Sequence, residues 1–410
     1  MSIGRRTLLG TAAALPLAGR ARAQGSAAPG ATIKIGVLND QSGVYRDISG
    51  PTSVACVRQA IEDFGAQGLT VEVLVGDHQN KPDIGTAIAR QWIDRDGVDM
   101  IIDVPNSALG LAINGVCKEK DRAYINSTAA TADLTGPACA PTTVHMTYDT
   151  WMLAHSTGAA MVASGGDTWF FVTADYAFGT ALERDTTAFV TKAGGKVIGS
   201  VRHPFPGNTD FSSFLLQAQA SKAKVIGICN AGTDTVNTIK QAAEFGITQG
   251  GQKLAGLLVF LNDVHALGLQ VAQGLVLTES FYWDLNDRTR ALTKRVLTKS
   301  AGVHPAMSHA GCYAGTLHYL KSCAALGAAE AKKSGAATVS HMKSKPTDDD
   351  AFGPGSIRAD GRALHPTYLF EVKTPAESKA PWDYYKLLAT TPADQAFRPL
   401  GDGNCPLVRA

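Results

Sequence analysis

Hydroxyl and amide side chains recur at turns where a strand-like segment gives way to a helix-like segment. Asn106 and Ser107 stand at one such turn, Thr128 at a second and Thr233 at a third. Backbone N–H groups at the start of a helix lack partners within the helix, and with nearby hydroxyls they hold a carboxylate without arginine or lysine. These four residues are therefore candidate contacts for a small organic acid.

Aromatic side chains stand close to these turns. Tyr45 follows the first strand-like segment of the chain, and Tyr176 and Phe178 follow a corresponding segment further along. Rings at such places suit stacking on a flat or apolar ligand. Both the polar turn residues and the aromatic residues also have a structural explanation. Ser107 and Asp234 could simply be helix N-caps, and the aromatic rings could simply pack in the core.

The sequence contains none of the common catalytic or cofactor motifs. It lacks G-x-S-x-G, G-x-x-x-x-G-K-[ST], a G-x-G-x-x-G after a strand, H-E-x-x-H and C-x-x-C. His304 and His309 are the closest pair of histidines, and Pro305 puts His304 before the helix expected to contain His309. The acidic run at 348–350 lies in a charged stretch where solvated carboxylates are expected. We therefore predict a binding protein rather than an enzyme, with no metal or cofactor.

Two consecutive segments repeat the same order of elements. In each, apolar runs of about five residues alternate with longer helix-like segments, which is typical of a parallel sheet covered on both faces. In the first copy we expect strands at 33–38, 70–75, 99–104 and 123–125 and helices at 54–65, 84–95 and 109–120. In the second we expect strands at 169–173, 196–201, 225–229 and 253–259 and helices at 180–193, 211–220 and 235–245.

This duplication predicts an α/β fold of two similar Rossmann-like lobes. Ligands of open parallel sheets bind at the carboxyl ends of the strands, so facing lobes enclose a cleft lined by paired loops. We expect lobe one to comprise 31–147 and 281–364, lobe two 148–280 and 365–390, and a C-terminal tail 391–410. Three connections between the lobes would form a hinge that opens and closes.

The remaining C-terminal segments are expected to complete both lobes. Helices are expected at 290–300 and 308–326, and strands at 274–278 and 365–372. The polar stretch 332–350 reads as a helix followed by a surface loop, and the packing of the tail is left open.

The N-terminus has the pattern of an export signal. Arg5 and Arg6 precede an apolar stretch at 7–19, which is too short to span a bilayer and is followed by a small-residue cleavage site ending at Ala23. The paired arginines resemble a twin-arginine signal, and an ordinary secretory signal is the alternative. We predict that residues 1–23 are removed near Ala23 and that the mature protein works in the periplasm.

The mature chain is nearly neutral. The 410 residues include 38 basic and 36 acidic side chains, a formal net charge of +2. Four of the arginines and none of the acidic residues fall in the first 24 positions, so the remainder has 34 basic and 36 acidic side chains, net −2. This balance provides no field for nucleic acid or an anionic membrane, and we expect a monomer.

Seven cysteines leave at least one thiol unpaired. Cys117 and Cys139 bracket a helix-to-loop excursion, and in an oxidising compartment we predict that their disulfide ties the loop 127–133 to the lobe. Cys405 in the tail could pair with any of the others. The remaining four lie in apolar patterns and are expected to be small buried side chains: Cys56, Cys229, Cys312 and Cys323.

Several segments of the chain resemble the periplasmic solute-binding proteins of the leucine/isoleucine/valine-binding type, which serve ABC importers. The segments are TIKIGVLNDQSGVY, TADYAFG and PFPGNTDFSSFLLQAQASKAKVIGICNAGTDTVNTIKQA. The resemblance runs through nearly the whole mature chain and implies a type I periplasmic binding fold, a small-molecule ligand and permease subunits in the inner membrane as partners. It also implies that the ligand-contacting positions of the family fall on Tyr45, Ser107, Thr128, Ala129, and Tyr176 or Phe178.

Two turns of lobe two depart from the members that bind amino acids. Those members hold the ligand ammonium with a tyrosine and a glutamate, whereas the matching turns here are 230–233 and 260–262. A buried ammonium without a carboxylate costs several kcal/mol, which argues against an amino acid. Asp263 lies one residue further along and could supply the charge, so amino-acid binding remains the alternative.

The chain looks most like the branch of the family that binds aromatic acids such as hydroxybenzoates and phenylpropanoids. The segments TYDTW, which contains Tyr148, and SFYWDLNDRTR carry this likeness. It implies a ligand carboxylate at Ser107 and the Thr128 turn and a ring among the aromatic residues. Asn230 or Asn262 would then meet a ring hydroxyl. A secreted sensor or adaptor with the same clamp is the other functional class.

Overall fold

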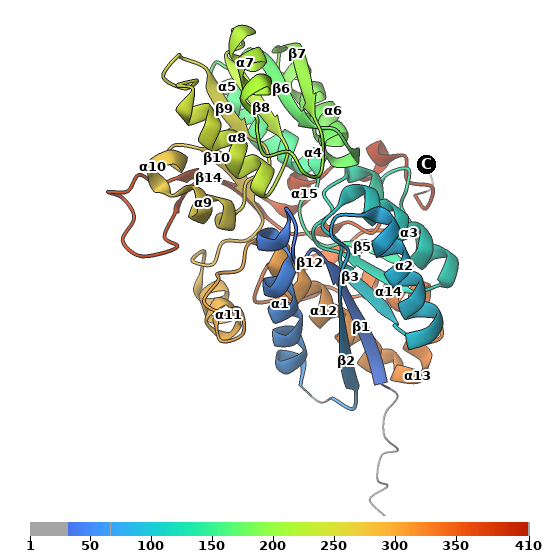
Figure 1. Cartoon of the computed structure of the whole chain (residues 1–410). Helices are drawn as coiled ribbons and strands as arrows, with labels where there is room; N and C mark the ends of the chain where they lie inside the picture. Colours follow the sequence, from blue (N-terminus) through green and yellow to red (C-terminus); the bar gives the residue numbers. More distant parts are fainter. Residues whose placement is uncertain (1–31, 66, 409–410) are drawn as a thin grey trace, which may run out of the picture.

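The computed structural model describes residues 32–65 and 67–408, and the predicted export signal at 1–23 lies outside them. Two lobes are visible, each built around a parallel sheet (Figure 1). The lower lobe in this view is drawn mainly in blue, teal and orange, and the upper lobe in green and yellow. The two-lobed α/β fold predicted from the sequence is confirmed. Across the described ranges, no helix combines the length and apolar character needed to cross a membrane.

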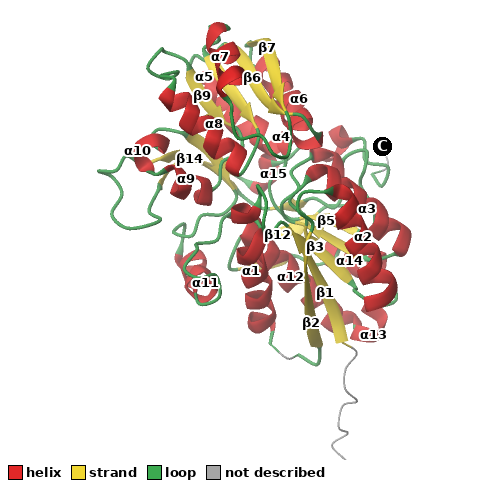
Figure 2. Cartoon of the chain, in the orientation of Figure 1, coloured by secondary structure: helices red, strands yellow, loops and turns green. Residues whose placement is uncertain are grey.

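Lobe one contains a five-stranded parallel sheet in the order β2-β1-β3-β4-β5. Its strands are β1 (Thr32–Asn39), β2 (Thr70–Asp77), β3 (Met100–Asp103), β4 (Ala123–Asn126) and β5 (Thr143–His145). The helices that alternate with them are α1 (Gly50–Phe64), α2 (Pro82–Gln91) and α3 (Ser107–Lys120). Figure 2 shows helices on both faces of the sheet.

Both faces of the lobe-one sheet are buried, which explains why its central strands are apolar at every position. Ile102 of β3 packs with α1 and with α12 (Met307–Leu326), whereas the next residue back, Ile101, packs with α2 and α3 on the other face. Successive side chains of a strand point to opposite faces, so two covered faces require two sets of apolar residues.

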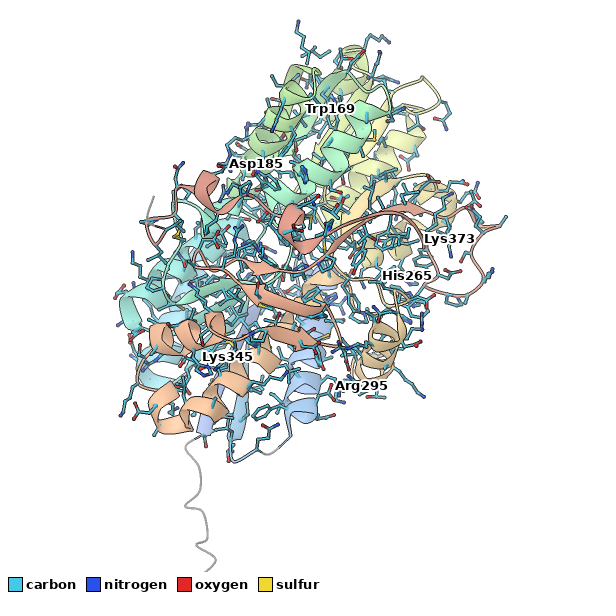
Figure 3. The ribbon with its side chains drawn as sticks, turned by 180° about the vertical axis from the view of Figure 1, so that it is seen from behind. Trp169, Asp185, His265, Arg295, Lys345 and Lys373 are labelled. Atoms are coloured by element: carbon cyan, nitrogen blue, oxygen red, sulfur yellow. A yellow bond between two sulfur atoms is a disulfide. The ribbon has the colours of Figure 1, made fainter. Side chains whose placement is uncertain are left out.

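Lobe two contains a four-stranded parallel sheet in the order β7-β6-β8-β9. Its strands are β6 (Thr168–Ala174), β7 (Lys196–His203), β8 (Val225–Cys229) and β9 (Lys253–Gly256). Its helices are α4 (Thr150–Leu153), α5 (Ala159–Ala163), α6 (Ala177–Lys192), α7 (Ser212–Ala220), α8 (Thr233–Glu244), α9 (Leu261–Leu267) and α10 (Leu269–Ala272). Trp169 lies inside this lobe (Figure 3) and is fully buried, with its indole N–H donating to the Gly166 carbonyl at 2.8 Å.

The C-terminal part adds helices to lobe one and two antiparallel sheets, one of which pairs the two strands expected at 274–278 and 365–372. The helices are α11 (Asp287–Leu297), α12, α13 (Ala328–Ala331), α14 (Gly335–Lys343) and the short α15 (Ala393–Ala396). One sheet has the order β10-β14-β15 and comprises β10 (Val276–Glu279), β14 (Thr367–Val372) and β15 (Tyr385–Thr391). The other comprises β11 (Thr347–Asp349), β12 (Gly353–Ile357) and β13 (Ala363–Leu364).

The stretch expected as a surface loop after α14 therefore contains a strand, and its acidic run is not uniformly solvated. Asp349 is buried, and its carboxylate accepts hydrogen bonds from the backbone N–H groups of Ala351 at 2.8 Å and Phe352 at 2.9 Å. The neighbouring Asp350 forms an ion pair at 2.8 Å with Arg295 of α11. Arg295 is labelled in Figure 3. The Asp349 carboxylate is thus stabilised by backbone N–H groups of the following turn and not by water.

A buried arginine holds the first connection between the lobes. Arg362 is fully buried and pairs with Asp149, with Nη1 3.1 Å from Oδ2. Its other terminal nitrogen donates to the carbonyl oxygens of His145 and Thr147. The guanidinium carbon lies 4.4 Å from the ring centroid of Phe397. Residues 145–149, where the chain leaves the lobe-one sheet, are therefore clamped by a segment that follows much later in the chain.

The predicted disulfide between Cys117 and Cys139 is wrong. Cys139 pairs instead with Cys405, their Cα atoms 5.6 Å apart, while Cys117 of α3 is a free thiol buried in the core beside the sheet. The tail is also held at this place by Arg398, which donates to the Ala132 carbonyl at 2.9 Å. The other four thiols are free and buried, as predicted.

Candidate functional site

Loops at the carboxyl ends of the two sheets meet where the lobes face each other. The backbone N–H of Thr233, at the start of α8, donates to the Val44 carbonyl of lobe one at 3.2 Å. Gly232 precedes it with φ +60°, and a Cβ there would lie 2.4 Å from the Val44 oxygen. Only glycine adopts this backbone conformation easily and allows such a close approach. The lobes are therefore in direct backbone contact at this site.

Three aromatic rings join the lobes at the same place. The Tyr45 hydroxyl of lobe one hydrogen bonds the Tyr176 hydroxyl of lobe two. Phe205, from the loop after β7, stacks on both rings, with centroids 4.1 Å from Tyr176 and 5.4 Å from Tyr45. Tyr45 and Tyr176 were predicted for the site and are brought together, whereas Phe205 was not predicted.

A narrow cavity of about 10 Å³ lies beside these rings in the closed structure. Its wall is formed by Tyr45, Ile48, Pro105, Ser107, Thr128, Ala130, Tyr148, Tyr176, Phe178, Ala231 and Leu258. All of these except Tyr176 are buried. Ligand sites are typically concave and mostly apolar with a few placed polar groups, which is the composition of this wall.

The lobe-one side of the cavity rests on a buried carboxylate. Asp103, the last residue of β3, accepts hydrogen bonds from Asn39 at 3.0 Å and Ser49 at 3.0 Å, and also from the Thr128 hydroxyl. Asp103 and Val104 have φ values of +85° and +62°. Left-handed backbone is costly for a β-branched residue and tends to persist at functional sites. Because the Thr128 hydroxyl donates its hydrogen bond to Asp103, it is not available to donate one to a ligand.

The Ser107 hydroxyl is available to donate a hydrogen bond to a ligand. Its Oγ accepts from the Thr131 N–H at 3.3 Å, and no acceptor for its own O–H is present among the residues that the structure describes. The N-cap of α3 is Asn106, whose Oδ1 accepts from the Leu109 N–H at 3.0 Å, so Ser107 is not the cap. Tyr148 donates to the Thr128 carbonyl at 2.8 Å.

Five of the predicted site residues do not line the cavity. They are Asn106, Ala129, Asn230, Thr233 and Asn262. Asn106 caps α3, the N–H of Ala129 donates to the Asn126 side chain at 2.9 Å, and the Thr233 side chain is exposed.

The two asparagines are held by their own lobe or by the segment beside it. The Asn230 amide contacts His203 at 3.2 Å and Thr238 at 3.0 Å, and its oxygen accepts from Thr235 at 2.8 Å. The Asn262 amide donates to the His304 carbonyl at 3.4 Å. The Asn230 side chain is thus engaged within lobe two, whereas the Asn262 side-chain oxygen is buried outside the cavity wall and has no partner among the described residues.

Two buried carboxylates of lobe two differ in their bonding. Asp263 accepts a hydrogen bond from the Phe260 N–H at 2.9 Å and so caps α9, and burial raises its pKa to about 8. Asp234 is equally buried, but neither carboxylate oxygen has a hydrogen-bond partner within the described ranges. Burial raises the pKa of Asp234 to about 7. Neither carboxylate lines the cavity of the closed lobes, and Asp263 differs from Asp234 in being engaged by the start of α9.

Sequence reasoning missed the apolar half of the wall. Ala130, Ala231 and Leu258 carry no chemistry that would single them out. Phe205 was part of the turn-rich segment RHPFPGNTD that follows the second strand of lobe two. An aromatic residue in a loop at the carboxyl end of a strand is the signal that could have found it.

Two lobes that close over a small cavity lined by rings and hydroxyls define a ligand-binding protein of the clamp type. The sequence model of the periplasmic binding protein family matches residues 32–379, and the chain belongs to that family. Proteins of this family bind small solutes outside the cytoplasm and work with the permeases of ABC transporters, as the resemblance in the sequence predicted.

Solved structures of similar proteins support the assignment. A periplasmic binding protein from Burkholderia mallei is 48% identical over 92% of this chain and 99% of its own, with a TM-score of 0.88. A branched-chain amino acid ABC transporter periplasmic ligand-binding protein from Burkholderia xenovorans is 39% identical over 92% of this chain and 99% of its own, with a TM-score of 0.80. No curated protein matches this chain in sequence.

A more distant structure shares the fold alone. It is a solute-binding protein of an ABC transporter from Rhodopseudomonas palustris in complex with 4-hydroxybenzoate. It is 21% identical over 90% of this chain and 99% of its own, with a TM-score of 0.79.

Proposed function

We propose that the protein captures a small aromatic carboxylate, of the hydroxybenzoate or phenylpropanoid type, and delivers it to an ABC transporter permease. The carrying observation is the cavity wall, in which Tyr45, Tyr148, Tyr176 and Phe178 surround a space whose polar groups include the Ser107 hydroxyl. A flat ring favours offset or edge contacts with such rings. Structures of the same fold in complex with benzoate, 4-hydroxybenzoate and 3,4-dihydroxybenzoate are consistent with this class.

In the proposed binding mode, the ligand carboxylate lies at the lobe-one side of the cavity. The Ser107 hydroxyl donates a hydrogen bond to it, and the Thr128 turn lies on the same side of the cavity. The ring extends toward lobe two, where Ala231 and Leu258 add apolar surface. Phe205 already stacks on both tyrosines, so the ligand enters while the lobes are open and meets three rings on closure.

Binding of a branched-chain amino acid is the second candidate, favoured by the name of the 39% identical relative. An ammonium needs a carboxylate in the cavity. Asp263, which the sequence suggested as the partner of that ammonium, is already engaged as the cap of α9. This weakens the case for an amino acid.

A thermal-shift comparison tests the ligand class. Benzoate and 4-hydroxybenzoate should raise the melting temperature through linkage to the native state, whereas leucine, isoleucine and valine should not. Ser107→Ala should weaken binding of the aromatic acid by about 1–3 kcal/mol, because a buried carboxylate oxygen loses its donor. Asp263→Asn should leave it nearly unchanged. Tight binding of leucine that Asp263→Asn abolishes would restore the amino-acid assignment.

The same proposal covers export and the absence of turnover. Residues 1–23 would act as a twin-arginine signal cleaved near Ala23, and the mature chain would be a monomer that returns its ligand chemically unchanged. N-terminal sequencing of the periplasmic protein and chromatography of the released ligand test these points. An intact N-terminus or a modified ligand would contradict them.

A further inference from the structure

The Asp234 carboxylate is buried and unpaired. The residue is 1% exposed, and both of its carboxylate oxygens lack a hydrogen-bond partner among the described residues. The His203 Nδ1 atom is 4.0 Å from Oδ2, beyond hydrogen-bond distance. That nitrogen contacts the Pro204 carbonyl at 3.0 Å, and the other ring nitrogen contacts Asn230 at 3.2 Å. Buried polar groups in folded proteins are nearly always bonded, so this exception requires an explanation.

Helix capping does not explain Asp234. Asp149 at the start of α4 accepts from the Met152 N–H at 2.8 Å, and Asp263 at the start of α9 accepts from the Phe260 N–H at 2.9 Å. Asp234 lies in the first turn of α8, yet it makes no such bond. The acidic side chains at the other two helix starts are thus bonded locally, and this one is not.

Asp234 does not line the cavity of the closed lobes, but it follows closely on residues that line it or pack against the aromatic rings. Ala231, three residues earlier, is part of the cavity wall, and Gly232 is packed against Val44 and Tyr45. Asp234 is therefore on the lobe-two side of the contact between the lobes, two residues from the glycine that packs against Tyr45, while Ser107 lies on the lobe-one side.

We propose that Asp234 is a specificity-determining residue that accepts a hydrogen bond from a hydroxyl on the ligand ring. This inference rests on the proposed function, in which the ligand carboxylate is held by lobe one. A ring hydroxyl at the other end of the ligand reaches the lobe-two side and satisfies a carboxylate that otherwise lacks a partner. The preferred ligand is then a hydroxylated aromatic acid rather than the unsubstituted acid.

Calorimetric titration of benzoate, 3-hydroxybenzoate and 4-hydroxybenzoate tests this preference. Wild-type protein should bind one of the hydroxylated acids roughly 10- to 100-fold more tightly than benzoate, because a site built around a buried acceptor rejects an analogue without the donor. Asp234→Ala should remove this difference and change the benzoate Kd by less than about threefold. Asp234→Asn retains one acceptor oxygen and should show an intermediate preference.

Glu244→Gln is the matched control, since Glu244 is an exposed acid at the far end of the same helix. It should keep the wild-type preference, and circular dichroism should show that every variant is folded. An equal preference in wild-type protein and Asp234→Ala overturns the role of Asp234 and leaves the proposed function standing. Binding of leucine in place of all three aromatic acids, lost in Asp234→Ala, overturns both.

Discussion

The hydroxyl of Tyr45 in lobe one is hydrogen bonded to the hydroxyl of Tyr176 in lobe two, and Phe205 stacks on both rings. The two tyrosines are 131 residues apart in the chain. Each follows the first strand of its lobe, so the duplication brings the same loop of both lobes to one point. Closure of the lobes is therefore favoured by direct contacts of the protein with itself.

Removal of one of these hydroxyls should favour the open form. Tyr176→Phe loses a bond worth about 0.5–1.5 kcal/mol, which corresponds to roughly a 2- to 10-fold shift toward open lobes. Small-angle X-ray scattering of ligand-free protein should record a larger radius of gyration. Tyr45→Phe should act alike, and the double variant should add little to either one. Tyr313→Phe, which breaks a hydroxyl contact to Asp63 within lobe one, should leave the radius unchanged.

The disulfide should stabilise the fold strongly. Cys139 and Cys405 are 266 residues apart, and closing so long a loop restricts the unfolded chain by about 5–6 kcal/mol in the chain-entropy model. Cys405→Ser should lower the urea midpoint accordingly, and a reductant should cause no further change in that variant. Non-reducing peptide mapping should link the peptides of Cys139 and Cys405. A bridged Cys117 in that map would contradict the structure.

Arg362 should be among the costliest side chains to replace. Arg362→Met leaves Asp149 buried without its partner and should destabilise the protein by about 3–5 kcal/mol in urea unfolding. The double variant with Asp149→Asn should recover part of this loss, because the asparagine keeps the cap of α4 and carries no charge. Arg288→Met removes exposed ion pairs and should cost no more than about 1 kcal/mol.

Asp234 should make the stability of the ligand-free protein depend on pH. Its pKa is about 7 in the native state and near 3.9 in the unfolded chain, so between these values the native state binds the extra proton. This contribution is complete below about pH 4 and is lost as the pH rises through 7.

Asp234→Asn should therefore be more stable than wild-type protein at pH 8, by on the order of 1–3 kcal/mol, and the gap should shrink toward pH 4. The nearby His203 has a lowered pKa and Tyr45 and Tyr176 have raised ones, each chiefly through burial, and all three are common to both proteins. Urea midpoints measured from pH 4 to pH 8 provide the comparison. Parallel curves for the two proteins would rule out this coupling.

Local periodicity was enough to predict the two parallel sheets. A strand covered on both faces must be apolar throughout, as Ile101 and Ile102 illustrate, and that requirement is visible in a window of a few residues. The rule that loops at the carboxyl ends of strands form the site then led to Tyr45, Ser107 and Tyr176, all of which line the cavity.

Partnerships between distant segments were decided only by the tertiary structure. Nothing near Cys139 in sequence indicates Cys405, and the ADGRAL segment gives no sign that Arg362 will be buried against Asp149. The strand β15 is likewise defined by its pairing with β14. Such contacts depend on where the chain returns after hundreds of residues, which no local pattern encodes.

The direction of each polar side chain in the site was also a tertiary outcome. The sequence by itself determined that Asn230 and Asp234 stand at a turn on the carboxyl edge of a sheet, because that follows from strand and helix order. Which of the two is bonded within lobe two and which is left without a partner depends on His203 and Thr238, brought there by β7 and by the next turn of α8. Residue order sets the position of a side chain along an element, and packing against neighbouring elements sets the group that it meets.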